Sequence, residues 1–534
     1  METKRKMGAG RIFWAAVLAA AGLLFSPGCT TDVNPVSGKR QMMGFSWSQE
    51  QQIGQQADAE IVQEYGLYDD PELAAYVTRV GQKVLAETEL RAPEAAAQYK
   101  NTQFTFRVLN SPVVNAFAVP GGYVYVTRGL LTHLDNEAQL AVVLGHEIGH
   151  VAARHSARQA AKAQLGQLGL MAGAILGSTV LENPQVAEQI VGLGGQAMQL
   201  LMTKYSRDAE READQLGVGW AAERGYDAAE SAAFFQTLKR IGERDGMRLP
   251  AWQSTHPDPG EREQTVKMIA AKNTPPGAIL SKGEDEFLKH IDGVIVGDDP
   301  REGFVRGNTF YHPELRFQFP VPQGWKVQNE RAAVMMMSPN RDAAMVFQLT
   351  GARSAQEAAQ KFAATQGLQV TDSKATRVNG QNAIAVVGQG NTQQGTVGLL
   401  NYFIEYNGRV YSFRGMSGAQ KFDNHRQQFQ RAMTGFARVT DSDVVSVKPA
   451  RLAVVTADRS ATFASFLPTS DVPGMTAEDV AILNQVQMNQ TVAAGTKLKL
   501  PRGGVDINRS LGTSRLREQP PGTISRERAP LGAP

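Results

Sequence analysis

Cysteine is nearly absent from this sequence, since Cys29 is the only one in 534 residues. A disulfide within the chain is therefore excluded, and the fold has to be stabilised by its apolar cores. A large excess of charge is also absent, because 55 basic residues stand against 52 acidic ones and the net charge is +3. This balance gives no reason to expect nucleic acid as a partner.

The apolar run near the N-terminus is too short for a stable membrane span. It reads IFWAAVLAAAGLLF and follows the basic start METKRKMGAGR, and this combination predicts an export signal over residues 1–28. Cys29 comes directly after it and resembles the lipidated cysteine of bacterial lipoproteins, while Thr30 and Thr31 resemble those sorted to the outer membrane. The resemblance implies a periplasmic protein with a lipid anchor at Cys29. The alternative is a plain signal peptide with an incidental cysteine.

The chain is too long for one ordinary core, so several domains are expected. From Trp47 onward apolar residues recur every three or four positions, as in helices, whereas after Gly303 runs such as LRFQF alternate as strands do. We expect the glycine-rich apolar segment Leu165–Leu181 to pack over the helical core rather than to form a membrane hairpin. The predicted division is a signal peptide at 1–28, an anchor linker at 29–46, a mainly helical domain at 47–290, an α+β domain at 303–440, a small strand–helix–strand unit at 448–502 and a disordered tail at 503–534.

The C-terminal half carries weaker signals. Asn407 and Gly408 stand between two alternating runs, YFIEY and RVYSFRG, and predict a tight hairpin. The domain at 303–440 loosely resembles PsbP-type domains. The pieces TAEDVAILNQV and VAAGTKLKLP of the unit at 448–502 resemble the second half of a LysM peptidoglycan-binding module. The opening of that unit lacks the usual aromatic and G-D-T pattern, so peptidoglycan binding and a plain packing role both stay open.

Histidine is scarce, with eight in the chain, yet three of them stand in LGHEIGHVAARH. Asn136 can cap a helix through this stretch, and His146 and His150, four residues apart, then point from one face toward one ion. Zinc prefers such neutral imidazoles, and Glu147 can take a proton from a water molecule that the metal has acidified. The alternative, a buried helix with two satisfied histidines, leaves the Glu147 charge buried without a partner, which is costly. We therefore predict a zinc site with Glu147 as its base.

A catalytic zinc needs a third protein ligand, and the helical stretch YSRDAEREADQLGV offers one. Glu210 and Asp214 are four residues apart and face the same way. One carboxylate can bind the metal while the other accepts a hydrogen bond from a ligand histidine and holds its tautomer. Taken alone, the stretch is better explained as a charged face in which Glu210, Arg211 and Glu212 are simply solvated.

Four motifs in one order, NAFAVPGG, HEIGHVAARH, SRDAEREAD and STHPDP, resemble the gluzincin metallopeptidases that include the CAAX prenyl protease and HtpX. The soluble, exported BepA-like branch is the part of the family that the chain resembles over about residues 40–290. The resemblance implies a mainly α zincin-like protease domain with a small β-sheet and one zinc ion per chain. It implies Glu147 as the base and Asp214 as the residue that supports a ligand histidine. The zinc ligands that it implies are His146, His150 and Glu210.

Two further segments are expected near the metal. If NAFAVPGG forms an exposed edge strand, it can bind a peptide by strand addition, with Asn115 and Ala116 as substrate contacts. A buried core strand is the alternative, and the two are compatible. His256 stands in the stiff turn STHPDPGER, and the family has this histidine near its zinc. Two catalytic roles stay open for it: a latch that occupies the fourth zinc position at rest, and a hydrogen-bond donor to the oxyanion. His155 lies off the ligand face, so we expect it to make a structural hydrogen bond.

These inferences lead to a zinc-dependent endopeptidase of the bacterial cell envelope that hydrolyses peptide bonds of misfolded or misassembled envelope proteins. The expected partners are polypeptide substrates and, through the lipid anchor, a membrane. The alternative is an envelope assembly factor, attached to peptidoglycan, whose protease fold is regulatory. The intact HEIGH and EREAD motifs argue against that alternative.

Overall fold

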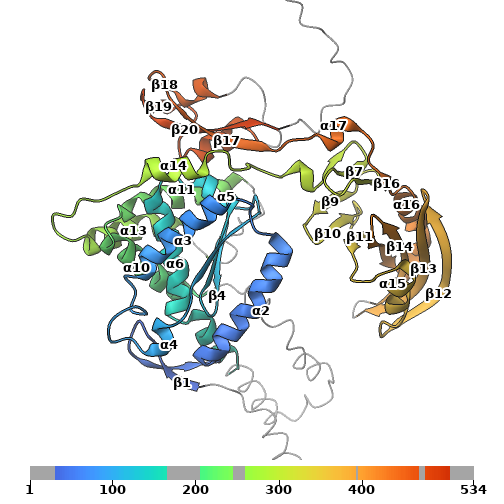
Figure 1. Ribbon diagram of the computed structural model, residues 1–534, viewed down its shortest axis with the longest axis horizontal. Coiled ribbons are helices and arrows are strands. Elements are labelled where there is room, and N and C mark those ends of the chain that lie inside the picture. The colour runs from blue at the N-terminus through green and yellow to red at the C-terminus, as the bar shows by residue number, and fades with distance from the viewer. Residues whose placement is uncertain are drawn as a thin grey trace, which may run out of the picture.

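A helix-rich region is followed along the chain by a β-rich region, and a small C-terminal unit lies against the helix-rich one, as the computed structural model in Figure 1 shows. The predicted signal peptide, Cys29, the segment Leu165–Leu181 and the tail beyond Gly504 lie outside the described residues. Within the described part of the chain, no helix is long and apolar enough to cross a membrane. The structure describes residues 30–164, 205–244, 256, 259–392, 395–467 and 475–504.

In the helix-rich region a three-stranded sheet lies beside a set of helices. Its strands have the order β3-β5-β4, with β3 parallel and β4 antiparallel to β5. Helix α6 contacts α3, α10 and β4, so it lies at the centre of this region. The elements are α2 (Trp47–Tyr65), α3 (Pro71–Leu85), α4 (Ala97–Lys100), β3 (Thr105–Leu109), β4 (Ala116–Val119), β5 (Tyr123–Thr127), α5 (Arg128–His133), α6 (Glu137–Ala152), α10 (Arg207–Glu223), α11 (Ser231–Arg244), α13 (Pro259–Asn273) and α14 (Glu284–Ile291).

Short polar side chains set the starts of the two central helices. Asn136 caps α6 by accepting a hydrogen bond from the Gln139 backbone N–H, and Ser206 caps α10 by accepting one from Ala209. Such oxygens satisfy backbone donors that have no partner within the helix. Every residue of α6 is buried, so the polar side chains of this helix face the protein interior.

Helices α6 and α10 approach each other closely because glycines face each other where they cross. A Cβ on Gly145 would lie 2.8 Å from the Gly217 carbonyl oxygen, and a Cβ on Gly217 would collide with the backbone nitrogen of His146. Further along, Gly149 faces Ala213 in the same way. The two helices are therefore antiparallel, and the first turn of α10 lies beside the HEIGH segment.

Residues 30–46 form a hairpin where the sequence analysis predicts a linker. Strand β1 (Thr30–Val33) pairs antiparallel with β2 (Arg40–Met43). The buried Asn34 side chain between them donates a hydrogen bond to the carbonyl of Ala153, just after α6. This partner lies 119 positions away in the chain, so the short polar stretch contains no local signal for it.

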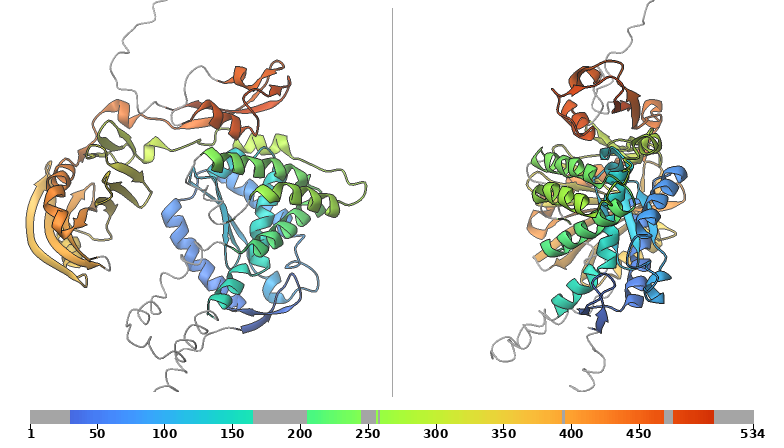
Figure 2. Two further views of the ribbon diagram at one scale, coloured as in Figure 1. Left: turned by 180° about the vertical axis from the view of Figure 1, so that it is seen from behind. Right: turned by 90° about the vertical axis from the view of Figure 1, so that its left-hand side faces the viewer.

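The β-rich region contains a seven-stranded and a four-stranded antiparallel sheet, in the orders β12-β13-β14-β15-β11-β10-β9 and β16-β8-β7-β6. The predicted hairpin is confirmed, because Asn407 and Gly408, with φ of 48° and 71°, join β14 to β15. Figure 2 shows from behind that the long curved strands lie away from the helix-rich region. The elements are β6 (Phe304–Arg306), β7 (Thr309–His312), β8 (Phe317–Pro320), β9 (Lys326–Asn329), β10 (Ala333–Met337), β11 (Ala343–Leu349), α15 (Ala355–Ala363), β12 (Leu368–Val378), β13 (Gln381–Thr392), β14 (Gly395–Tyr406), β15 (Arg409–Gly418), α16 (Phe422–Thr434), β16 (Ala437–Arg438) and α17 (Ser442–Val445).

The described residues of the C-terminal unit form two two-stranded sheets, one α-helix and a short 3-10 helix. Strand β17 pairs antiparallel with β20, and the short β18 pairs with β19. Leu452 of β17 and Leu483 of α18 belong to the same buried apolar cluster as the residues of α6. The unit therefore extends the core of the helix-rich region. Its elements are β17 (Ala450–Thr456), β18 (Ala461–Thr462), α18 (Ala477–Leu483), β19 (Thr491–Val492) and β20 (Lys497–Gly503).

Candidate metal centre

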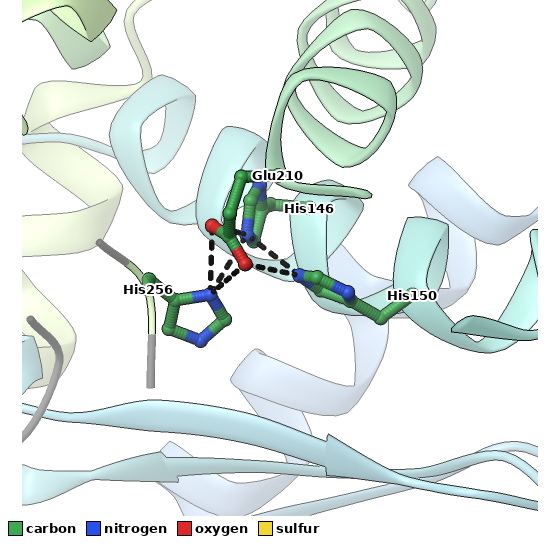
Figure 3. Close-up of side chains that lie close together, drawn as sticks. All are labelled: His146, His150, Glu210 and His256. Carbon is green, nitrogen blue, oxygen red and sulfur yellow. Dashed lines mark hydrogen bonds and ion pairs between the residues drawn. The ribbon is translucent and has the colours of Figure 1, made fainter. Parts of the chain in front are cut away.

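His146 and His150 lie one turn apart on α6, and both side chains are buried. Their Nε2 atoms are 3.0 Å apart, and Figure 3 shows the two rings directed toward one place. The helical period of about 3.6 residues brings positions i and i+4 to the same face. Helix α6 alone therefore assembles this pair of imidazole donors.

Glu210 approaches the pair from the first turn of α10. One of its carboxylate oxygens lies 3.5 Å from His146 Nε2, and the other lies 3.5 Å from His150 Nε2. Burial alone would raise the pKa of Glu210, but the charge of His256 and the hydrogen bonds from His146 and His256 outweigh burial and hold this pKa well below its usual range. Glu210 is therefore an anionic donor facing both histidines.

His256 completes a cluster of four donors (Figure 3). Its Nδ1 lies 3.0 Å from each oxygen of Glu210 and 3.3 Å from His146 Nε2. One donor atom from each of the four side chains lies within 4.8 Å of the other three. Imidazole nitrogens and carboxylate oxygens are the ligand types that catalytic zinc binds. The donor set therefore fits a metal ion of the zinc type.

Glu147 lies beside this cluster, and neither of its buried carboxylate oxygens has a hydrogen-bond partner among the described residues. Its Oε1 lies 3.6 Å from His256 Nε2. Burial raises the pKa of Glu147, and the charges of His256 and His146 only partly oppose this. A buried carboxylate without a donor is costly, and a cation beside it would remove that cost. Glu147 is thus a second observation that fits a metal here.

Asp214 and Arg262 form a buried pair behind His146. Arg262 donates from Nε to Asp214 Oδ2 over 2.8 Å and from Nη2 to Oδ1, and Oδ1 lies 2.9 Å from His146 Nδ1. Burial would raise the pKa of Asp214, but the charge of Arg262 holds it below its usual value. A histidine that binds a metal through Nε2 carries its proton on Nδ1, and Asp214 Oδ1 lies where it can accept that proton in a hydrogen bond.

Arg262 is a site residue that the sequence analysis missed. It comes from α13, 48 positions after Asp214, and although it is the last residue of the quoted stretch STHPDPGER, the sequence analysis assigned it no role. Tyr205 was missed as well. Its ring stacks on that of His150, with centroids 4.0 Å apart and planes 19° apart. His155 lies outside the four-donor cluster and makes a hydrogen bond to His150, with 2.8 Å between the two Nδ1 atoms.

The strand predicted to bind substrate lies at an edge of the three-stranded sheet, since β4 pairs only with β5 among the described strands. Ala116 is fully buried, while Asn115 is half-buried and its Oδ1 has no partner among the described residues. Further along β4, Ala118 and Val119 line a small cavity together with His150. The strand therefore passes close to a metal-site histidine, while the Ala116 side chain belongs to the core.

All of these side chains fall within one family match. Residues 71–270 match the model of peptidase family M48. A metal-binding pair of histidines on one helix, with a glutamate between them, is typical of metallopeptidases. The site residues that lie inside the M48 region are Asn115, Ala116, His146, Glu147, His150, Glu210, Asp214, His256 and Arg262.

Curated relatives match parts of the chain. The beta-barrel assembly-enhancing protease of Escherichia coli (strain K12) is 29% identical over 261 residues, which are 48% of this chain and 51% of that protein. The mitochondrial metalloendopeptidase OMA1 of Bos taurus is 34% identical over 182 residues, or 32% of this chain and 34% of that protein. The chain thus spans about half, or less, of the length of the curated relatives it matches. Among solved structures, cyanobacterial PsbP (CyanoP) from Synechocystis sp. PCC 6803 matches 26% of this chain and 94% of its own, at 14% identity and a TM-score of 0.22.

Proposed function

We propose that this protein is a zinc-dependent endopeptidase. The observation that carries the proposal is the buried convergence of His146, His150 and Glu210 beside the Glu147 carboxylate, which has no hydrogen-bond donor among the described residues. The match of residues 71–270 to peptidase family M48 supports the same function.

Each residue of the centre has a distinct role in this proposal. His146, His150 and Glu210 hold one zinc ion per chain, and Asp214, itself held by Arg262, orients His146. When bound, zinc supplies a Lewis acid that polarises the scissile carbonyl and lowers the pKa of water.

Glu147 acts as the general base. It takes a proton from the attacking water molecule and passes it to the leaving amine. Burial raises the pKa of Glu147, and a carboxylate whose pKa lies closer to the working pH is better suited to both transfers. This shift supports the proposed role.

Substrates are proposed to bind as an additional strand, at Asn115 and Ala116, along the edge of β4 that pairs with no other described strand. Because the Ala116 side chain is buried, the contacts would come from backbone groups. The cavity that Ala118 and Val119 share with His150 supports this placement, since a peptide paired with β4 would run toward the metal ligands.

Misfolded or misassembled proteins of the bacterial cell envelope are the proposed substrates. The relatives named beta-barrel assembly-enhancing protease support this class. The protein is further proposed to be exported and anchored in the periplasm, at the outer membrane, through a lipidated Cys29. Mass spectrometry of the protein purified from membranes should find an acyl chain on Cys29, and an unmodified thiol would contradict the anchor.

For the unit at 448–502 we propose a packing role in place of peptidoglycan binding. Lys499 of β20 is buried and donates hydrogen bonds to the carbonyls of Thr132 and Leu134, directly before α6. Leu452 and Leu483 lie in the core of the helix-rich region. A module that binds glycan as a separate unit would not need these buried contacts.

The deciding experiment compares purified wild type with Glu147→Gln and Glu60→Gln for zinc content and for cleavage of unfolded casein. Glu147→Gln keeps every metal donor, so zinc should stay stoichiometric while cleavage falls about 100-fold or more, the usual contribution of a general base. Glu60 is exposed on α2, and its variant is the matched control that should change neither quantity. Equal cleavage by Glu147→Gln and wild type would contradict the proposed function. An assembly factor with a regulatory protease fold would instead cleave nothing even as wild type.

A further inference from the structure

His155, the third histidine of LGHEIGHVAARH, lies against the ligand histidine His150. The chain turns at Arg154, which has φ of 55° and whose buried guanidinium is held by Glu50 and Asp32. The turn brings the His155 ring beside that of His150, with 2.8 Å between the two Nδ1 atoms. His155 is buried and has no atom in the four-donor cluster, and the cluster member to which it is hydrogen-bonded is His150.

On its other side His155 contacts a carboxylate. Its Nε2 lies 3.1 Å from Glu212 Oε2, and the same oxygen accepts a hydrogen bond from Arg158 Nη1 over 2.7 Å. Glu212 is the residue that the sequence pattern assigns to a solvated face of α10. In the structure Glu212 is half-buried, with 29% of its side chain exposed, and it contacts a buried histidine and a half-buried arginine.

The positions of the protons in this chain follow from the donors available. An ionised carboxylate only accepts hydrogen bonds, so the short contact with Glu212 requires the proton of His155 to be on Nε2. In neutral His155 the Nδ1 atom is then a bare acceptor, and the 2.8 Å contact places the proton of His150 on its Nδ1. That tautomer leaves His150 Nε2, the atom facing Glu210 and His146, free to bind a metal. The reverse assignment would place a bare nitrogen against the carboxylate and a proton on the metal-binding nitrogen.

We propose that His155 is a positioning residue that holds His150 in its metal-binding tautomer, with Glu212 and Arg158 fixing His155 in turn. This inference rests on the proposed metal site. Each ligand histidine then has its own orienting pair. Asp214 and Arg262 lie behind His146. His155 and Glu212 lie behind His150. Helix α10 supplies both carboxylates as well as Glu210, which explains the density of acidic residues in EREAD.

The test measures zinc affinity by competition with a chelator on the purified full chain, which needs no catalysis. His155→Leu removes the acceptor and should weaken zinc binding about 10–100-fold, the usual effect of losing a residue that orients a ligand. In His155→Asn the side-chain oxygen can replace Nδ1 as acceptor, so affinity should return to within about threefold of wild type. In Glu212→Gln the side-chain amide can donate as well as accept a hydrogen bond, so it no longer fixes the proton of His155 on Nε2. The loss of zinc affinity should therefore lie between those of His155→Asn and His155→Leu. Asp208 is exposed one turn before Glu212 on α10, so Asp208→Asn is the matched control and should change nothing.

Thermal unfolding of the metal-free proteins separates positioning from a merely structural role. The midpoints of His155→Asn and Glu212→Gln should match each other while their zinc affinities differ. Wild-type affinity in both His155→Leu and Glu212→Gln would overturn the inference, as would a His155→Asn protein that loses as much affinity as His155→Leu. If His155→Leu does not fold, the comparison of His155→Asn with Glu212→Gln still decides. A wild-type protein that binds no zinc would instead contradict the proposed function itself.

Discussion

The ammonium group of Lys499 lies 2.7 Å from Asp135 Oδ1, although 364 positions separate the two residues in the chain. It also donates hydrogen bonds to the backbone carbonyls of Thr132 and Leu134, over 3.0 and 2.7 Å. Asp135 directly precedes Asn136, the residue that caps α6. An ion pair and two hydrogen bonds thus connect the last strand of the C-terminal unit to the start of the helix that carries His146, Glu147 and His150.

Replacing Lys499 with methionine should destabilise the protein by about 3 kcal/mol, because it leaves a partly buried carboxylate and two buried carbonyls without their donor. The matched control is Lys497→Met on the same strand. Lys497 pairs with Asp285, whose side chain is 88% exposed, and such surface pairs contribute about 0.2–1 kcal/mol. Urea denaturation of both variants measures the difference between their free energies of unfolding. Equal midpoints would show that the contacts of Lys499 do not stabilise the protein.

Removing His256 tests whether it is a latch. Its Nδ1 lies among the metal donors and its Nε2 faces Glu147, which supports the latch over the oxyanion donor. We therefore expect His256→Ala to raise basal cleavage of casein, because the fourth zinc position becomes open. An oxyanion donor would give the opposite result, a fall of about 10²–10³ with zinc retained. The double variant His256→Ala, Glu147→Gln is the control, since any added cleavage must disappear with the base.

The β-rich region should lose stability in acid through His312. Burial lowers the pKa of His312 to about 4, and its Nδ1 accepts a hydrogen bond from the Leu315 backbone N–H over 3.2 Å. An unfolded histidine titrates near pH 6.5, so between pH 6.5 and 4 the unfolded state binds a proton that the folded state does not. The stability that neutral His312 permits is therefore complete above pH 6.5, decreases by about 3 kcal/mol as the pH falls from 6.5 to 4, and changes no further below pH 4.

His312→Asn provides the comparison for this pH dependence. The asparagine oxygen can accept the Leu315 hydrogen bond but does not titrate. Urea denaturation of the full chain at pH 7 and at pH 4.5 should show a smaller loss for the variant than for wild type, by about 2 kcal/mol. Parallel pH dependence of the two proteins would mean that His312 is not the group responsible.

Local sequence determined the parts of the metal centre that one helix can arrange. The four-residue spacing of His146 and His150 and the cap at Asn136 set one helical face, because the helical period is a property of the backbone itself. The hairpin at Asn407 and Gly408 was determined in the same way, since few residues other than asparagine and glycine accept positive φ at both positions of such a turn.

Contacts between distant segments were decided only by tertiary structure. Arg262 meets Asp214 across 48 positions, His155 meets Glu212 across 57, and Lys499 meets Leu134 across 365. A charged residue on an amphipathic helix has the same local pattern whether it faces water or a buried partner, which is why Glu212 is assigned to solvent by its sequence.

The packing of α6 against α10 resolved that ambiguity. Glycines at 145 and 217 allow the two backbones to approach closely, so Glu210 and Asp214 of α10 are buried beside the histidines, while Glu212 is half-buried. The sequence by itself determined which residue types are present and which of them share a helical face. Tertiary packing alone decided which of those faces are buried and which partners they meet, because burial depends on surfaces that come together only when the whole chain has folded.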